Sequence, residues 1–279
     1  MLYTSPLIYL TPLAAFLGPL ISASPLNSRA EPPKAADPPI VDNNGVIKVY
    51  WHVITANDTL EGGHLPLETM RHQIEMLNRN YEGSGFSFVL HDHGYYQNKD
   101  WFHNNDPQGT LVDSLQRSQL ITPLEKERGT NVKNPSDMNI WSINDPNPNF
   151  GGEGAFPSAI IDETVGITMD VDYLQKDSPV LTHEVGHWMG LLHTFDMECE
   201  NNGDFLSDTI AERIPTEVQQ KNCEPRIGCD GKSFVPTNFM SYGGTECISE
   251  FSEQQKSLMR TNMLKIRGFK AGPIAPNTA

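Results

Sequence analysis

The sequence predicts an α+β fold, in which strands and helices follow one another early in the chain and loops dominate its last part. Residues 46–54 alternate apolar and polar side chains, which is typical of a half-buried strand. Residues 67–77 carry apolar side chains at helical spacing. All four cysteines lie between positions 199 and 247, so disulfide-bonded loops are expected only there.

Three elements are expected before residue 100. A strand over residues 46–54 should bury one face, which carries Ile47, Val49, Trp51 and Val53. A helix should follow and be closed by Gly83, with an apolar face made of Leu67, Met70, Ile74 and Leu77. Phe86–Leu90 is expected to form the next strand.

The rest of the chain supplies further elements. Met138–Ile143 predicts a short strand, and apolar β-type residues recur from Ala159 to Asp170. A polar cap with proline at the first helical position, Asp177–Pro179, opens another helix. The capping box Ser252–Gln255 opens the last helix, which Gly268 ends and whose apolar positions are Leu258, Met259, Met263 and Ile266.

The helix after Pro179 carries the pattern H-E-x-x-H-x-x-G-x-x-H over residues 183–193. With His183 at zero on a helical wheel, His187 lies at about 40° and Glu184 at about 100°. Two imidazoles and a carboxylate therefore share about a quarter turn. Gly190 can take the left-handed conformation, so the chain can turn back and bring His193 to the same point. The far side of the helix is apolar and can enter a core: Leu181, Val185, Trp188 and Met189.

Three neutral imidazoles with one open position describe a catalytic zinc site, and Glu184 is placed as the general base for water. A lone H-E-x-x-H is often a chance match on a solvated helix face. The glycine and third histidine at fixed offsets, and a methionine turn at Asn238–Tyr242, favour one catalytic zinc instead. The remaining alternatives are a decayed enzyme that keeps the metal, and coincidence.

The stretches HEVGHWMGLLHTF (183–195), GDFLSDT (203–209) and NFMSY (238–242) resemble the pappalysin family of metzincin metalloproteases, in particular its short secreted members of fungal and bacterial type. The resemblance is dense over residues 137–266 and looser over 46–101. Residues 104–133 show no pattern that can be assigned. The resemblance implies a zincin-like fold of two lobes around a cleft. A twisted mixed sheet and the active-site helix would form an upper lobe over 46–190. An irregular, disulfide-bonded lower lobe would cover 191–270.

The resemblance also implies several roles. Gly154–Pro157 would be the edge strand at the rim of the cleft, where an extended peptide can add as a strand. Met240 would be a structural floor under the imidazoles, and the Tyr242 hydroxyl would donate to the oxyanion of the substrate. Spacing alone leaves three cysteine pairings open, of which the resemblance favours Cys199–Cys229 and Cys223–Cys247. Calcium near 203–209 is an option in the family, but the sequence does not specify its ligands.

Composition and the N-terminus indicate a secreted, extracellular protein that is expected to be monomeric. Hydrophobic content of 38% suits a soluble globular domain, and the net charge of −15 disfavours nucleic acid and anionic membranes. Residues 1–23 have the pattern of a signal peptide, followed by a linker or short propeptide over 24–45, a catalytic domain over 46–272 and a tail over 273–279. Asn57 begins the one N-x-S/T sequon and is a candidate glycosylation site.

The sequence therefore predicts a secreted zinc endopeptidase that hydrolyses extracellular proteins. The alternatives are an inactive homologue that binds zinc and a protein partner, and a zinc hydrolase of non-peptide bonds. Two weaker patterns are interpreted as surface features: His91 and His93 lack a third metal ligand, and Asp145–Asn149 has the glycine and glutamate of a calcium loop out of register.

Overall fold

The computed structural model describes residues 44–103, 136–147, 149–157, 166–174 and 177–273. The expected signal peptide, nearly all of the expected linker, the stretch 104–133 and the tail from 274 lie outside the described residues. Within the part that is described, no helix is both long and apolar enough to cross a membrane.

A five-stranded mixed sheet organises the first part of the chain. Its strands are β1 (Val46–Thr55), β2 (Ser87–Gln97), β3 (Met138–Ile143), β4 (Gly152–Gly154) and β5 (Ile167–Asp170). Their order is β2-β1-β3-β5-β4, and all neighbours are parallel except the antiparallel pair β4 and β5. The α+β fold with a mixed sheet is thus confirmed, and β4 is an edge strand.

The strands follow the predicted pattern in β1 and depart from it in β2 and β4. The four β1 residues expected to face the core are all fully buried. β2 runs to Gln97, well past the expected end at Leu90, because its pairing with β1 continues beyond a register shift at Val49/Tyr50. The sequence predicts the edge strand at Gly154–Pro157, but the strand occupies Gly152–Gly154, and these three residues are in register with β5.

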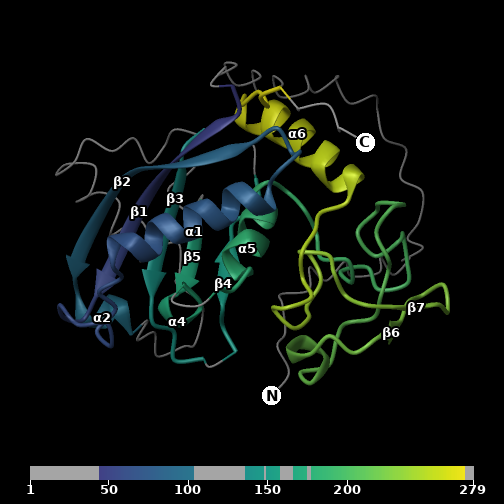
Figure 1. Cartoon of the computed structure of the whole chain (residues 1–279), viewed down its shortest axis with the longest axis horizontal. Coiled ribbons are helices and arrows are strands. Elements are labelled where there is room, and N and C mark those ends of the chain that lie inside the picture. Colours follow the sequence, from purple (N-terminus) through teal and green to yellow (C-terminus); the bar gives the residue numbers. More distant parts are fainter. Residues whose placement is uncertain (1–43, 104–135, 148, 158–165, 175–176, 274–279) are drawn as a thin grey trace, which may run out of the picture. The chain divides into compact units, whose positions relative to one another are not determined.

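Two helices cover one face of the sheet. Figure 1 shows α1 (Leu67–Asn80) and α5 (Val180–Trp188) side by side on that face, and they share its main apolar core. The expectation that Gly83 closes α1 is wrong: the helix ends at Asn80 and Gly83 lies in the following turn, with φ at 76°. Pro179 is likewise the N-cap of α5 and not its first residue. Two short helices, α2 (Lys99–Phe102) and α4 (Val171–Leu174), flank a smaller core.

The last helix, α6 (Glu253–Arg267), has the predicted capping box. The Ser252 hydroxyl accepts from the Gln255 amide N–H at 3.1 Å, and the Gln255 side chain accepts from the Ser252 N–H at 2.9 Å. Gly268 ends the helix with φ at 63°. The buried Met259 and Met263 belong to the same core as β1 and α5, so α6 packs with the sheet domain.

Residues 191–251 are mostly irregular. Apart from a 3-10 turn at Gln219–Lys221 and a two-stranded ribbon, β6 (Arg226–Ile227) with β7 (Ser233–Phe234), they form loops. Disulfides join Cys199 to Cys229 and Cys223 to Cys247, which are the two pairs that the resemblance implies. Asp208 accepts from Ser252 and from the Gln254 N–H at the start of α6, each at 2.8 Å, so it braces the loops against that helix.

Candidate active site

Helix α5 and the turn after it position the three histidines. The Tyr81 hydroxyl donates to the Thr182 carbonyl at 3.0 Å, which fixes α5 against the end of α1. After Trp188 the chain reverses at Gly190, whose φ of 88° lies in the left-handed region that glycine adopts most easily. The Leu191 N–H then bonds back to the Gly186 carbonyl at 2.9 Å, and His193 returns toward the helix.

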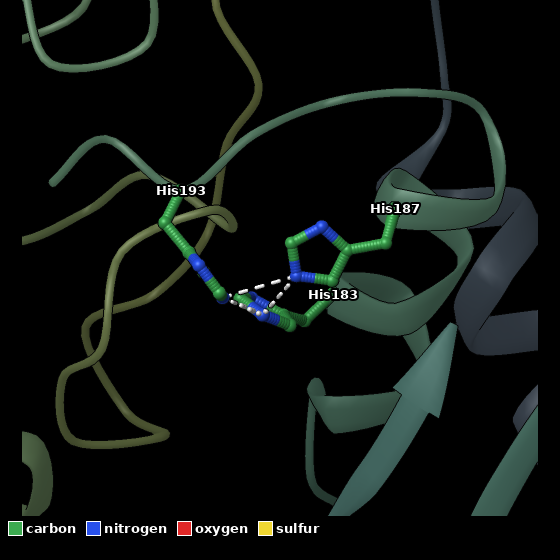
Figure 2. Close-up of side chains that lie close together, drawn as sticks. All are labelled: His183, His187 and His193. Carbon is green, nitrogen blue, oxygen red and sulfur yellow. Dashed lines mark hydrogen bonds between the residues drawn. The ribbon is translucent and has the colours of Figure 1, made fainter. Parts of the chain in front are cut away.

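The Nε2 atoms of the three histidines converge on one point (Figure 2). The separations are 3.1 Å between His183 and His187, 3.1 Å between His183 and His193, and 3.0 Å between His187 and His193. Two nitrogens on one tetrahedral zinc are expected about 3.3 Å apart for Zn–N bonds of about 2.0 Å. The spacing is therefore close to that of three nitrogen ligands on one zinc ion.

The other nitrogen of each ring is already engaged with an oxygen. Nδ1 of His183 lies 2.6 Å from the Phe239 carbonyl, and Nδ1 of His187 lies 2.8 Å from the Leu191 carbonyl. Nδ1 of His193 lies 2.9 Å from Oδ1 of Asp196. A carbonyl oxygen can only accept, so Nδ1 of His183 and His187 carries the proton and Nε2 keeps its lone pair.

Burial keeps the two helical imidazoles neutral. Loss of solvent lowers the pKa of His183 to about 3 and lowers the pKa of His187 well below 6.5, with a further lowering from the neighbouring histidines. Ring nitrogens that point their lone pairs at one another repel unless a cation lies between them. The donor set therefore fits a divalent metal that prefers nitrogen ligands, as zinc does.

Glu184 is buried beside the triad and is held by the edge strand. Its Oε2 accepts from the Gly154 N–H at 2.7 Å. Burial raises its pKa to about 8, the Gly154 hydrogen bond opposes this, and the charge of Glu153 adds to it. Glycine is required for this contact, because a Cβ at position 154 would lie 2.1 Å from the Glu184 carbonyl oxygen.

The methionine turn lies against the same helix. Met240 is fully buried, and its Sδ is so near α5 that a Cβ on Gly186 would lie 2.4 Å from it. The Tyr242 ring is centred 5.4 Å from the His183 ring and 4.9 Å from the His193 ring. The structure thus brings Met240 and Tyr242 to the triad.

Comparisons with known proteins agree with this geometry. Residues 131–264 match the family model Peptidase_M43, described as pregnancy-associated plasma protein-A. Over these residues the chain is similar to the M43, or pappalysin, family. Extracellular metalloproteases are similar over most of their length: 27% identity with that of Colletotrichum graminicola, covering 77% of this chain and 75% of that protein, and 26% with that of Pyricularia oryzae, covering 90% and 87%.

A solved structure supports the fold. Mirolysin, in complex with compound 9, superposes with a TM-score of 0.53 at 18% identity, covering 77% of this chain and 90% of that chain. The metzincin-like fold is thereby confirmed. The pappalysin resemblance of the motifs is confirmed as well, so this chain is an extracellular metalloprotease with a three-histidine zinc site.

The other candidate residues from the sequence lie apart from the histidine triad. His91 and His93 contact aromatic rings, those of Tyr50 and Tyr95 respectively. Among the described residues, only the triad forms a group of three potential metal ligands. Asn57 lies on an exposed turn, where its Oδ1 accepts from the Thr59 N–H at 2.9 Å.

Sequence reasoning missed three contacts of this candidate active site. Asp196 orients the third histidine, and the pattern H-T-F-D after the motif was its only signal. The Gly154 N–H holds Glu184 from a strand of three residues. The third is a buried ion pair between Glu212, in a loop, and Arg226, in the two-residue strand β6, neither of which follows a periodic pattern in the sequence.

Proposed function

We propose that this protein is a secreted zinc-dependent endopeptidase in which His183, His187 and His193 hold one zinc ion and Glu184 is the general base. The observation that carries the proposal is the convergence of three Nε2 atoms within 3.1 Å, with each Nδ1 bound to an oxygen. When bound, zinc supplies a Lewis acid that lowers the pKa of water and polarises the scissile carbonyl.

Glu184 moves the proton in this scheme. Its carboxylate takes a proton from the attacking water and returns it to the leaving amine. The Gly154 N–H binds Oε2, so the carboxylate cannot rotate freely about its last bond. Burial raises the pKa of Glu184, and a carboxylate with a raised pKa is a stronger base once it is ionised.

Tyr242 stabilises the charge that develops on the substrate carbonyl. Its ring stands next to the rings of His183 and His193, which supports placing its hydroxyl at the oxyanion. Met240 is assigned a structural role, because its thioether packs against α5 at Gly186 and an apolar floor restricts the movement of the ligand rings.

The peptide substrate binds in extended form along β4. Ala155 N–H bonds to the Gly166 carbonyl and Asp170 N–H bonds to the Gly151 carbonyl, each at 3.0 Å, so residues 151 and 155 face β5. In an antiparallel ladder the N–H and C=O groups of Gly152 and Gly154 then point away from β5, toward the outer edge of the sheet. On that side the Gly154 N–H binds Glu184. A peptide added at this edge runs past the catalytic carboxylate.

Processing and modification complete the proposal. Residues 1–23 are a signal peptide, residues 24–45 a linker or short propeptide, and the catalytic domain of residues 46–272 acts as a monomer. Asn57 carries a glycan in the secreted protein, because its side chain is exposed on a turn in an N-x-T sequon. A glycosidase should reduce the mass of the secreted protein, and the Asn57→Gln variant should show no such loss.

Hydrolysis of casein or gelatin tests the proposed activity. The purified protein should cleave both, a zinc chelator should abolish cleavage, and added zinc should restore it. An inactive homologue would bind zinc but cleave nothing, and a hydrolase of non-peptide bonds would leave both proteins intact. Cleavage that persists in chelator would remove zinc from the mechanism.

A further inference from the structure

We propose that the buried ion pair between Glu212 and Arg226 is a positioning element for Tyr242. The two side chains come from the irregular segment 191–251, and their hydrogen-bond partners include residues next to the triad in the sequence. Nη1 of Arg226 lies 2.8 Å from Oε2 of Glu212. The guanidinium is planar, so it holds this geometry more rigidly than a lysine ammonium would. Both side chains are at least 96% shielded from solvent.

Glu212 connects two segments that border the active site. Its Oε1 accepts from the Thr194 hydroxyl at 3.0 Å and from the Ser241 hydroxyl in a short hydrogen bond. Thr194 directly follows the third histidine, and Ser241 directly precedes Tyr242. The Thr194 N–H also donates to the Met240 carbonyl at 3.1 Å, so the two segments are cross-linked by backbone as well.

Arg226 binds Tyr242 through its second terminal nitrogen. Its Nη2 donates to the Tyr242 carbonyl in a short hydrogen bond and to the Gln219 carbonyl at 2.7 Å. The ion pair therefore binds the methionine turn on both sides of the Cα of Tyr242. Glu212 binds the Ser241 hydroxyl, and Arg226 binds the Tyr242 carbonyl. The direction in which the Tyr242 ring leaves the backbone is set by these two contacts.

A purely stabilising role explains this arrangement less well. A buried ion pair is weak evidence for stability, because removing two charges from water offsets much of their attraction. Apolar side chains of similar volume would fill the same space. They could not accept two hydroxyl donors and bind a carbonyl at once, and these are the contacts that orient the turn. The inference rests on the proposed role of Tyr242 as the oxyanion donor.

A double-mutant cycle between Glu212→Gln and Tyr242→Phe tests the proposal. The glutamine keeps the size of the side chain but is neutral, so the attraction between residue 212 and Arg226 becomes weaker. We expect kcat on a peptide substrate to fall about ten- to a hundredfold, with unchanged zinc content and KM within about threefold, because an oxyanion donor acts mainly in the transition state. On the Tyr242→Phe background, Glu212→Gln should cost less than about threefold in kcat, since the hydroxyl that it positions is gone.

Two further variants keep the test decisive. Glu198→Gln is the matched control, because Glu198 pairs with Arg213 at 3.3 Å on the surface, and it should leave kcat unchanged. If Glu212→Gln does not fold, the paired replacement Glu212→Leu with Arg226→Met removes both charges together and should fold while still losing kcat.

Three results would overturn the proposal. One is a wild-type kcat for zinc-loaded Glu212→Gln or for the folded paired replacement. Another is that Glu212→Gln lowers kcat by the same factor in the Tyr242→Phe background as in wild type, because the ion pair would then act without the Tyr242 hydroxyl. A wild-type kcat for Tyr242→Phe alone would remove the oxyanion role and this inference with it, while chelator-sensitive cleavage of casein would leave the peptidase activity standing.

Discussion

Replacing Gly154 by alanine probes how the edge strand holds the catalytic carboxylate. An alanine Cβ would lie 2.1 Å from the Glu184 carbonyl oxygen and 3.1 Å from the His187 Cβ, whereas ordinary contact begins at 3.4 Å. The nearest obstacle is helix backbone, which cannot rotate away, so β4 must retreat by about 1 Å. The hydrogen bond of 2.7 Å from the Gly154 N–H to Glu184 would then lengthen beyond bonding range.

The expected cost follows from that displacement. Misplacing a catalytic group by about 1 Å costs about a hundredfold in rate, so kcat should fall about a hundredfold while the zinc content stays at one per chain. The assay is steady-state cleavage of a peptide substrate, with zinc measured on the same sample. Gly151→Ala is the matched control, because its Cβ would meet only side-chain atoms, at 3.1 Å or more, and its kcat should stay within about threefold of wild type. A near wild-type kcat for Gly154→Ala, or an equal loss in Gly151→Ala, would refute the reasoning.

Two further predictions concern Tyr242 and the protonation of Glu184. Tyr242→Phe should lower kcat about ten- to a thousandfold with little change in KM and none in zinc content, and an unaltered kcat would return Tyr242 to a packing role. In the metal-free protein burial raises the pKa of Glu184 to about 8, so at pH 7 this carboxyl holds its proton. A bound divalent cation favours the carboxylate, so zinc loading at pH 7 should release about one proton more from wild type than from Glu184→Gln, because zinc-bound water can lose a proton in both proteins. Calorimetry in buffers of different ionisation enthalpy measures this, and equal proton release in Glu184→Gln would assign the proton elsewhere.

The parts that the sequence predicts are those governed by local rules. The helical spacing of His183, Glu184 and His187 and the return at Gly190 follow from the geometry of one helix and its glycine end. The alternation in β1 and the capping box at Ser252 are equally local, and the structure has both. These elements place the zinc ligands, which is why the triad can be predicted from a single stretch.

The parts that the sequence does not predict depend on contacts between distant segments. Residues after Leu90 lack a clear apolar alternation, and β2 continues through them because β1 supplies a parallel partner up to Thr55. Glu212 lies in a loop and Arg226, 14 residues later, in the two-residue strand β6, and only the folded chain brings them to the methionine turn. Gly154 resembles any loop glycine until the helix backbone lies against it.

The most direct test of the account is the peptidase activity of Glu184→Ala in its zinc-loaded form. Glu184 is a buried carboxylate beside three converging imidazoles, and it is not one of the three residues assigned to the metal. The account predicts that the variant binds one zinc per chain, as wild type does, and loses nearly all cleavage of casein. A zinc-loaded Glu184→Ala that cleaves casein at a near wild-type rate would contradict the assignment of the base.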